Sequence, residues 1–238
     1  MDDALPAGIA VFNAGHYHAA HDAWEDRWLD LASGTDDERF LHGLIQYTAA
    51  VYHARRGNWS GATGLATSAR EYLSGLPADY RAVNVGAVRA YLRRLGADPE
   101  LIERRSPPAL TYRGRAVGLD DLDFPAAAVA ALVLAEDDGR YDEEPVERAV
   151  RYAREELAGG TRTRFIALVM DFAADGANRD LIYRRLCDHV DRRRSRERDV
   201  DGLFDRRAGR TDDETDGDGG DDHETDGDGG GDDGGGCR

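Results

Sequence analysis

The sequence predicts an all-α protein, and two observations support this prediction. Apolar residues recur three and four positions apart along most of the chain, which is the spacing of one face of an α-helix, and the alternating pattern of β-strands is nearly absent. Glycines and a Pro-Pro pair divide these periodic stretches into segments of helical length. The 238 residues are enough for one large or two small domains with a buried core.

The pattern of the first half of the chain predicts five helices, and a glycine follows most of them. Asn58 is a suitable N-cap for the fourth helix. Gly15 is followed by an aromatic residue and an alanine, and Gly57 repeats this order, which is typical of tight turns in helical hairpins. We therefore expect a bundle built from helix hairpins, weakly similar to tetratricopeptide repeats. The predicted helices cover about 4–13, 17–32, 37–55, 59–73 and 80–95.

The pattern of the second half predicts a separate helical unit. Pro107-Pro108 and two glycines indicate a linker, with a short extended piece near 109–117. Asp123 before Phe124-Pro125 and Glu144 before Pro145 indicate two helix starts, and one-face apolar spacing continues to Val190. The predicted organisation is an N-terminal helical bundle (1–103), a linker (104–118), a C-terminal helical unit (119–205) and an acidic Gly/Asp-rich tail (206–238).

Charge is distributed unevenly along the chain. It carries 47 acidic and 31 basic residues, all of the latter Arg, for a net charge of −16, which argues against a nucleic-acid binder. Twelve of the acids lie in 211–238, where no apolar residue occurs between Thr211 and Gly236, so we expect this tail to be disordered. The lack of Lys and the excess of Asp indicate a halophilic composition. The Arg-rich run 192–198 is interpreted as a solvated helix end.

Nothing in the sequence predicts an association with membranes. The longest apolar run, 124–135, has twelve residues, whereas about 20 are needed to span a bilayer. The first residues are acidic and lack the apolar region of a secretory signal. Two cysteines are too few for a disulfide framework or a Cys-rich zinc site. We expect a soluble, cytoplasmic protein.

The polar residues that could carry chemistry lie on the second and third predicted helices. Tyr17, His21, Trp24, Trp28 and Leu31 are spaced 4, 3, 4 and 3 residues apart, so they share one face, which we expect to be buried. If the two helices are hairpin arms, polar side chains of one face those of the other. The predicted polar cluster consists of His18, His21, Asp22 and Glu25 on the second helix and His42, Gln46 and His53 on the third.

These helices also carry a family resemblance. The residues 12–28, with Phe12-Asn13, Gly15, Tyr17 and Ala20-His21-Asp22-Ala-Trp24-Glu25, are followed in order by Gly43-Leu44-Ile45-Gln46 and by His53 before Gly57-Asn58. Over residues 5–80 this pattern resembles the family called domain of unknown function 309. Asp22 stands where the family pattern has Glu, and His42 where it has Gln. The resemblance implies a small helical fold and no established reaction.

Several interpretations of the polar cluster remain open. We favour a non-catalytic binding or structural module, in which the cluster forms a hydrogen-bonded network that fixes how the helices cross. The alternative is a metal-dependent hydrolase in which His21, Glu25 and His53 bind Zn²⁺ or Fe²⁺, with an open position for water and with Asp22 or His18 as proton-transfer partner. Metal-free catalysis by a His–Glu pair is a further alternative. A recognition groove for a peptide or protein would use an aromatic surface formed by Tyr17, Trp24, Trp28 and Trp59.

Overall fold

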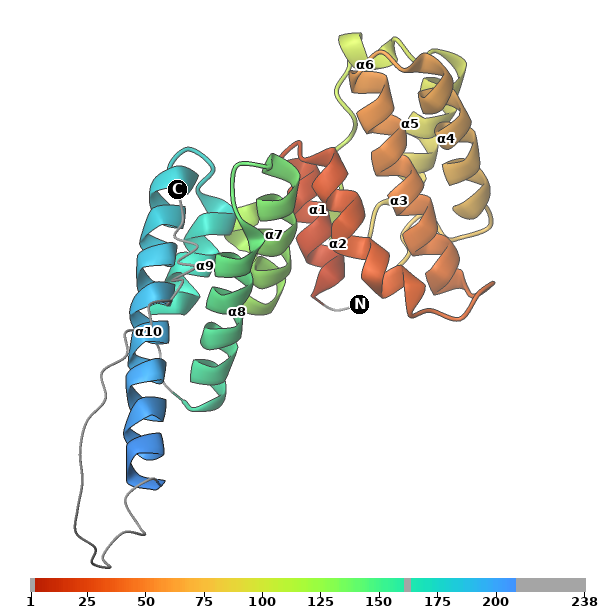
Figure 1. The fold of residues 1–238 in the computed structure, drawn as a ribbon. Helices are drawn as coiled ribbons and strands as arrows, with labels where there is room; N and C mark the ends of the chain where they lie inside the picture. The colour runs from red at the N-terminus through yellow and green to blue at the C-terminus, as the bar shows by residue number, and fades with distance from the viewer. Residues whose placement is uncertain (1–2, 161–163, 209–238) are drawn as a thin grey trace, which may run out of the picture.

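The computed structural model describes residues 3–160 and 164–208, and it confirms the all-α prediction (Figure 1). The tail that we predict to be disordered lies outside the described residues from residue 209 onward. The first half contains α1 (Ala4–Asn13), α2 (Tyr17–Leu29), α3 (Asp36–Arg55), α4 (Trp59–Tyr72), α5 (Val85–Ala97) and the short α6 (Leu101–Arg104). The second half contains α7 (Phe124–Asp138), α8 (Glu143–Ala158), α9 (Arg164–Ala174) and α10 (Arg179–Ala208).

Helices α1 and α2 occupy the centre of the molecule. Helices α3 to α6 lie on one side of this pair and α7 to α10 on the other (Figure 1). Helix α7 packs against both α1 and α2, and the buried residues of the two sides form one continuous core. Residues 7–12 of α1 are all buried, so this helix has no solvated face over most of its length.

The predicted hairpin turns are confirmed. Gly15 joins α1 to α2 with a φ of +92°, and Gly57 joins α3 to α4 with a φ of +70°. Both angles lie in the left-handed region, which glycine adopts without a steric penalty. The Asn58 side chain caps α4 by accepting a hydrogen bond from the backbone N–H of Gly61 at 3.0 Å. The second helix is shorter than predicted and ends at Leu29 rather than near residue 32.

The predicted start of the fifth helix, at Tyr80, is wrong. The helix α5 begins at Val85, and Tyr80 and Val83 instead pair through their backbones. Between them, Arg81 and Ala82 have φ values of 52° and 61°, which a right-handed helix cannot contain. The periodicity of the apolar residues does not reveal this reversal of the chain.

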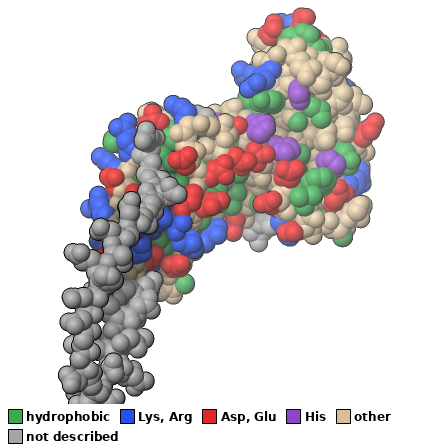
Figure 2. Space-filling view, viewed as in Figure 1, with side chains coloured by type: hydrophobic (Ala, Val, Ile, Leu, Met, Phe, Trp, Pro, Cys, Tyr) green, Lys and Arg blue, Asp and Glu red, His purple; other side chains and the backbone are tan. Residues whose placement is uncertain are grey.

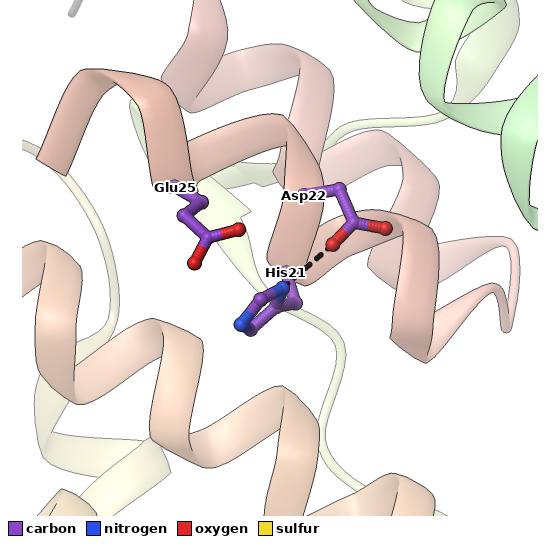
Figure 3. Close-up of side chains that lie close together, drawn as sticks. All are labelled: His21, Asp22 and Glu25. Atoms are coloured by element: carbon purple, nitrogen blue, oxygen red, sulfur yellow. Dashed lines mark hydrogen bonds and ion pairs between the residues drawn. The ribbon is translucent and has the colours of Figure 1, made fainter. Parts of the chain in front are cut away.

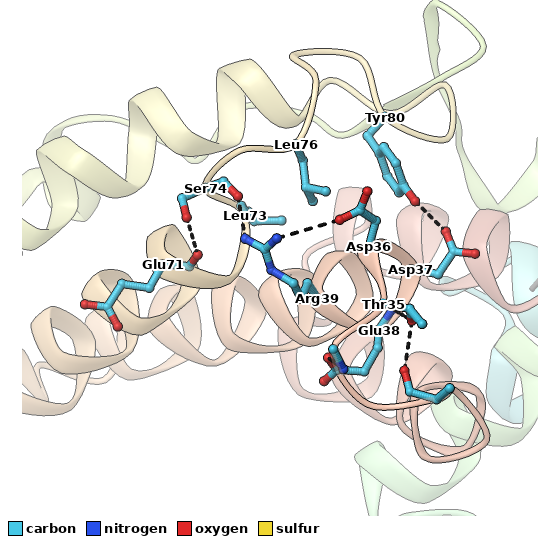
Figure 4. A network of polar contacts seen from close by, with 12 residues as sticks. Thr35, Asp36, Asp37, Glu38, Arg39, Glu71, Leu73, Ser74, Leu76 and Tyr80 are labelled. Carbon is cyan, nitrogen blue, oxygen red and sulfur yellow. Dashed lines mark hydrogen bonds and ion pairs between the residues drawn. The ribbon is translucent and has the colours of Figure 1, made fainter.

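Polar contacts hold this loop to the start of α3 (Figure 4). The Tyr80 hydroxyl donates to Asp37 at 2.7 Å, and Arg81 forms an ion pair with the same carboxylate. Arg39 donates to the backbone carbonyl of Ser74 at 2.5 Å. Thr35 caps α3 by accepting from the N–H of Glu38 at 3.2 Å. These contacts connect the first turn of α3 to the segment between α4 and α5.

The segment predicted as a linker packs onto the end of α1. It contains the predicted extended piece as two short antiparallel strands, β1 (Thr111–Tyr112) and β2 (Arg115–Ala116). The Asn13 side chain donates to the carbonyls of Leu110 and Val117, at 2.9 Å each, and accepts from the N–H of Leu110 at 2.8 Å. Leu110 and Val117 are buried. Asn13 therefore holds both ends of this hairpin to the end of α1 through hydrogen bonds.

The second half follows the predicted helix starts. After a 3-10 turn, η1 (Leu119–Asp121), the Asp123 side chain caps α7 by accepting from the N–H of Ala126 at 3.2 Å. Helix α8 begins at Glu143, one residue before the predicted start. Of the described helices, none combines the length and the apolar character that crossing a membrane requires.

Candidate functional site

Most of the candidate residues lie on α2 or next to it. This helix is packed between two others. It contacts α3 on one side and α7 on the other (Figure 1). Its side chains therefore line depressions on both sides. Tyr17 and His21 line a pocket with residues of α3, whereas Asp22, Glu25 and Asp26 line a groove with residues of α7 and α8. His18 contacts residues on both sides.

Three side chains of α2 form what we call the His21 group. It consists of His21, Asp22 and Glu25, and one ligand atom of each lies within 4.8 Å of the others (Figure 3). The Nδ1 atom of His21 is 2.7 Å from Asp22 Oδ1. Because an ionised carboxylate can only accept, Nδ1–H of His21 is the donor, and Figure 3 shows the second ring nitrogen directed away from Asp22. This hydrogen bond raises the pKa of His21 above its usual value, although partial burial opposes it.

A small pocket lies between the side chains of α2 and α3. Its volume is about 220 Å³. It contains His21 and His53, so two members of the predicted polar cluster that lie on different helices line the same cavity. The lining residues are Tyr17, His18, His21, Ala49, Tyr52 and His53.

The protonation of His53 follows from its neighbours. Since Asn58 Oδ1 accepts from the N–H of Gly61, Asn58 Nδ2 is the donor toward His53 Nδ1, at 2.8 Å. Nδ1 of His53 is therefore the acceptor, and the neutral ring carries its proton on Nε2. A metal ion at Nδ1 of this ring would have to replace the hydrogen bond from Asn58.

His42 and Gln46 lie in a different environment. Their side-chain nitrogens are 3.3 Å apart, and the His42 ring lies between those of Trp28, at 4.4 Å, and Tyr72, at 3.8 Å. Glu38 lies 3.5 Å from the other nitrogen of His42 and accepts from Trp28 at 3.0 Å. This pair therefore stabilises the packing of α2, α3 and α4.

An acidic groove runs between α2 and the helices α7 and α8. It has a volume of about 520 Å³, and Figure 2 shows acidic side chains gathered across the middle of this face, with histidines beside them. Seven carboxylate residues and one Arg line it, over an apolar floor. Partial burial and the nearby carboxylates of Asp22 and Glu143 raise the pKa of Glu136. The acidic lining residues are Asp22, Glu25, Asp26, Asp30, Glu136, Glu143 and Glu147, and the floor consists of Ala4, Ala23, Val129, Leu132 and Val133.

Histidine–carboxylate contacts connect α2 to α7 at one end of this groove. Asp137 of α7 lies 3.7 Å from the Nδ1 atom of His16 and 3.5 Å from that of His18. The same atom of His18 is 3.3 Å from Asp22. These contacts place the carboxylates of α7 beside those of α2.

The four residues of the predicted aromatic surface, Tyr17, Trp24, Trp28 and Trp59, differ in burial. Trp24 is completely buried, and its indole N–H points to the Leu5 carbonyl at 3.4 Å. Tyr17, Trp28 and Trp59 are partly buried against the core. His21 is not buried with Trp24, because 30% of its side chain is exposed. Trp24 is therefore a core residue, and the expectation that the whole face from Tyr17 to Leu31 is buried is wrong.

Comparison with known proteins agrees with the predicted resemblance. Residues 5–65 match a family model described as Domain of unknown function (DUF309). Residues 5–65 are therefore similar to this family, and we call them the DUF309 segment. This segment covers α1 to α3 and the first half of α4. An uncharacterized protein of Aquifex aeolicus is 27% identical to the chain over 102 residues, which are 43% of this chain and 29% of that protein.

The DUF309 segment supplies only one wall of the acidic groove. Asp22, Glu25, Asp26 and Asp30 belong to it, whereas the opposite wall comes from α7 and α8. Our sequence analysis does not identify Glu136, Asp137, Glu143 or Glu147 as site residues. The sequence does show acidic residues directly after the apolar run 124–135. It does not show that α7 packs on α2, because this contact joins residues that are distant in the sequence.

Proposed function

We propose that this protein is a non-catalytic binding module that holds a cationic segment of a partner protein in the acidic groove. The observation that carries the proposal is the composition of the groove, in which seven carboxylate residues and one Arg surround an apolar floor. A partner segment with Arg or Lys would place its charged ends beside the carboxylates and its aliphatic stems on the floor.

The groove favours a cation because its carboxylates are close enough to affect one another. The raised pKa of Glu136 reflects this proximity, since burial and neighbouring negative charges both disfavour its ionised form. A bound cationic group would remove this repulsion. The contribution of each pair is modest at a partly exposed surface, about 0.2–1 kcal/mol, so binding depends on several pairs together.

The histidines support this function by fixing the shape of the groove. His16, which precedes α2, and His18 of α2 contact Asp137 of α7, and within α2 His21 holds Asp22. This role corresponds to the conformation-fixing network that we favour from the sequence.

The test compares two variants with the same change in net charge. In the first, three carboxylates of the α7/α8 wall are neutralised by Glu136→Gln, Glu143→Gln and Glu147→Gln. In the control, the exposed residues Glu71, Glu103 and Asp171, which lie outside the groove, are changed to Gln, Gln and Asn. Because both variants keep the acidic tail, its attraction for cations is the same in each.

The probe is a fluorescein-labelled peptide of alternating Arg and Leu, and binding is measured by fluorescence anisotropy in EDTA. We expect the groove variant to bind about tenfold more weakly than the natural chain, equivalent to about 1.4 kcal/mol. The control variant should bind within about twofold of it. Equal losses in the two variants would mean that the peptide responds to net charge alone, and this result would refute the proposal.

A further inference from the structure

A groove between α9 and α10 has the opposite charge to the acidic groove. The two helices lie side by side (Figure 1), and the groove between their side chains has a volume of about 430 Å³. It shares no lining residue with the acidic groove. We call it the cationic groove, and its charged and imidazole side chains are those of Arg164, Arg185, Asp188, His189 and Arg192.

The cations of this groove form a row along one face of α10. The residues spaced 4, 3 and 4 positions apart, as on one helical face, are Arg185, His189, Arg192 and Arg196. Arg164 adds a charge from the first turn of α9. Partial burial lowers the pKa of His189, and the nearby guanidinium groups of Arg192 and Arg164 lower it further. The imidazole is therefore mostly neutral at pH 7, and the positive charge of the row comes from the Arg residues.

Most of this positive charge has no carboxylate partner. Within the part of the chain that the structure describes, no ion pair involves Arg164, Arg185 or Arg196. Arg192 lies 3.8 Å from Asp188, but its side chain is 59% exposed. Several guanidinium groups close together with one carboxylate among them repel one another and attract an anionic segment.

We propose that the acidic tail of the same chain, residues 211–238, binds in the cationic groove. The tail contains twelve acidic residues and one Arg, so its charge is opposite to that of the groove. It contains no apolar residue between Thr211 and Gly236, so its contacts with the groove are carboxylate–guanidinium pairs. Each exposed pair contributes little by itself, so binding depends on several pairs formed together.

The tail is long enough to reach the groove. Helix α10 ends at Ala208, and the distance along the helix from Arg192 to this end is about 24 Å at a rise of about 1.5 Å per residue. An extended chain covers about 3.3–3.6 Å per residue, so about eight residues span this distance. The residues that remain contain most of the acids of the tail.

The observations favour the tail over a separate anionic partner. Because the tail is attached to the end of α10, its local concentration at the groove is on the order of millimolar, which a free partner rarely reaches. A tail in the groove also covers the cations that would otherwise attract nucleic acid or another polyanion. The inference does not rest on the proposed binding function, since the two grooves have no residue in common.

The experiment places a nitroxide spin label on the tail of the full chain and records the backbone amide signals by NMR. Cys187→Ala and Cys237→Ala remove both cysteines, and Thr225→Cys supplies the labelling position in the middle of the tail. A nitroxide broadens the signals of the amides that it approaches. The groove variant also carries Arg164→Gln, Arg185→Gln and Arg192→Gln. The control variant has the same net charge and carries Arg70→Gln, Arg93→Gln and Arg94→Gln, at exposed positions of α4 and α5.

We expect the broadening to centre on residues 164–168 and 185–192 in the labelled chain and in the control variant. In the groove variant, the ratio of bound to unbound tails should fall about tenfold, and the broadening should fall with it. Raising the salt from about 0.1 M to about 1 M should also release the tail, because the Debye length falls from about 10 Å to about 3 Å. Equal broadening in the groove and control variants, or broadening centred outside α9 and α10, would overturn the proposal.

A mixing experiment separates the tail of the same chain from the tail of a second copy. Spin-labelled chain without isotope is mixed with isotope-labelled chain without nitroxide. Broadening of α9 and α10 in this mixture would overturn the proposal, because it would mean that the tail binds another copy. Amide signals outside α9 and α10 report whether each variant is folded. No cationic peptide is used, so a negative result would leave the proposed binding function standing, and the reverse also holds.

Discussion

Gly8 and Gly64 allow the same substitution to be tested in two opposite environments. Gly8 lies on α1 against Trp24, and a Cβ atom at this position would be 2.2 Å from the indole nitrogen and 2.3 Å from Cε2. Trp24 is fully buried and its ring is rigid, so the clash cannot be relieved locally. Overpacking of this kind costs about 1–3 kcal/mol, and the better helix propensity of Ala recovers about 0.5–1 kcal/mol. We expect Gly8→Ala to lower the free energy of unfolding by about 1–2 kcal/mol.

Gly64 lies on the exposed face of α4, with no heavy atom within 4 Å of a Cβ placed there. Here only the helix propensity changes, so Gly64→Ala should raise the free energy of unfolding by about 0.5–1 kcal/mol. The two substitutions are chemically identical. Their opposite signs therefore depend on the position of the Trp24 ring alone.

Urea unfolding followed by circular dichroism measures both effects as changes in the midpoint at constant slope. A third and a fourth protein, Trp24→Leu with and without Gly8→Ala, complete a double-mutant cycle, in which the smaller side chain should remove most of the cost of the added methyl group. If Gly8→Ala matched or exceeded the stability of the natural chain, the close packing of α1 on Trp24 would be wrong.

Two further outcomes follow from the hydrogen bonds described above. Asn13→Ala removes three bonds to Leu110 and Val117 and leaves their backbone groups without partners, so we expect a loss of about 2 kcal/mol in urea unfolding, and a loss below about 0.5 kcal/mol would contradict this. The Asp22 hydrogen bond raises the pKa of His21, so its stabilisation is complete below the unfolded pKa of 6.5 and is lost as the pH rises through the folded value. His21→Gln, measured in EDTA, should therefore destabilise the chain more at acidic than at alkaline pH, whereas a pH-independent difference would refute the ion pair.

Local signals in the sequence predicted the helices of the first half well where glycines and capping residues mark their ends. Gly15, Gly57 and Asn58 act within a few residues of the positions they define, so their effects can be predicted without knowing the fold. The error at Tyr80 has a physical cause. Arg81 and Ala82 adopt a left-handed backbone that neither residue favours by itself, and the contacts of Tyr80 and Arg81 with Asp37 of α3 help to hold it.

The candidate site was predictable only in part, for a similar reason. The His21 group lies within one turn of α2, so its spacing was visible in the sequence. The opposite wall of the groove depends on α7 crossing α2, which is decided by packing between distant segments. The sequence could not show that Asn58 orients His53 or that His42 stacks between Trp28 and Tyr72.

The central position of α1 has a consequence for synthesis of the chain. This helix leaves the ribosome before α7, which covers part of its apolar surface and begins at Phe124, more than a hundred residues later. At translation rates of about 5–20 residues per second, the interval is on the order of ten seconds. During that time α2 can already pack on α1, but the apolar surface that α7 covers in the folded chain is exposed. Ribosome-associated chaperones that recognise apolar segments would therefore meet this surface of α1 before α7 exists.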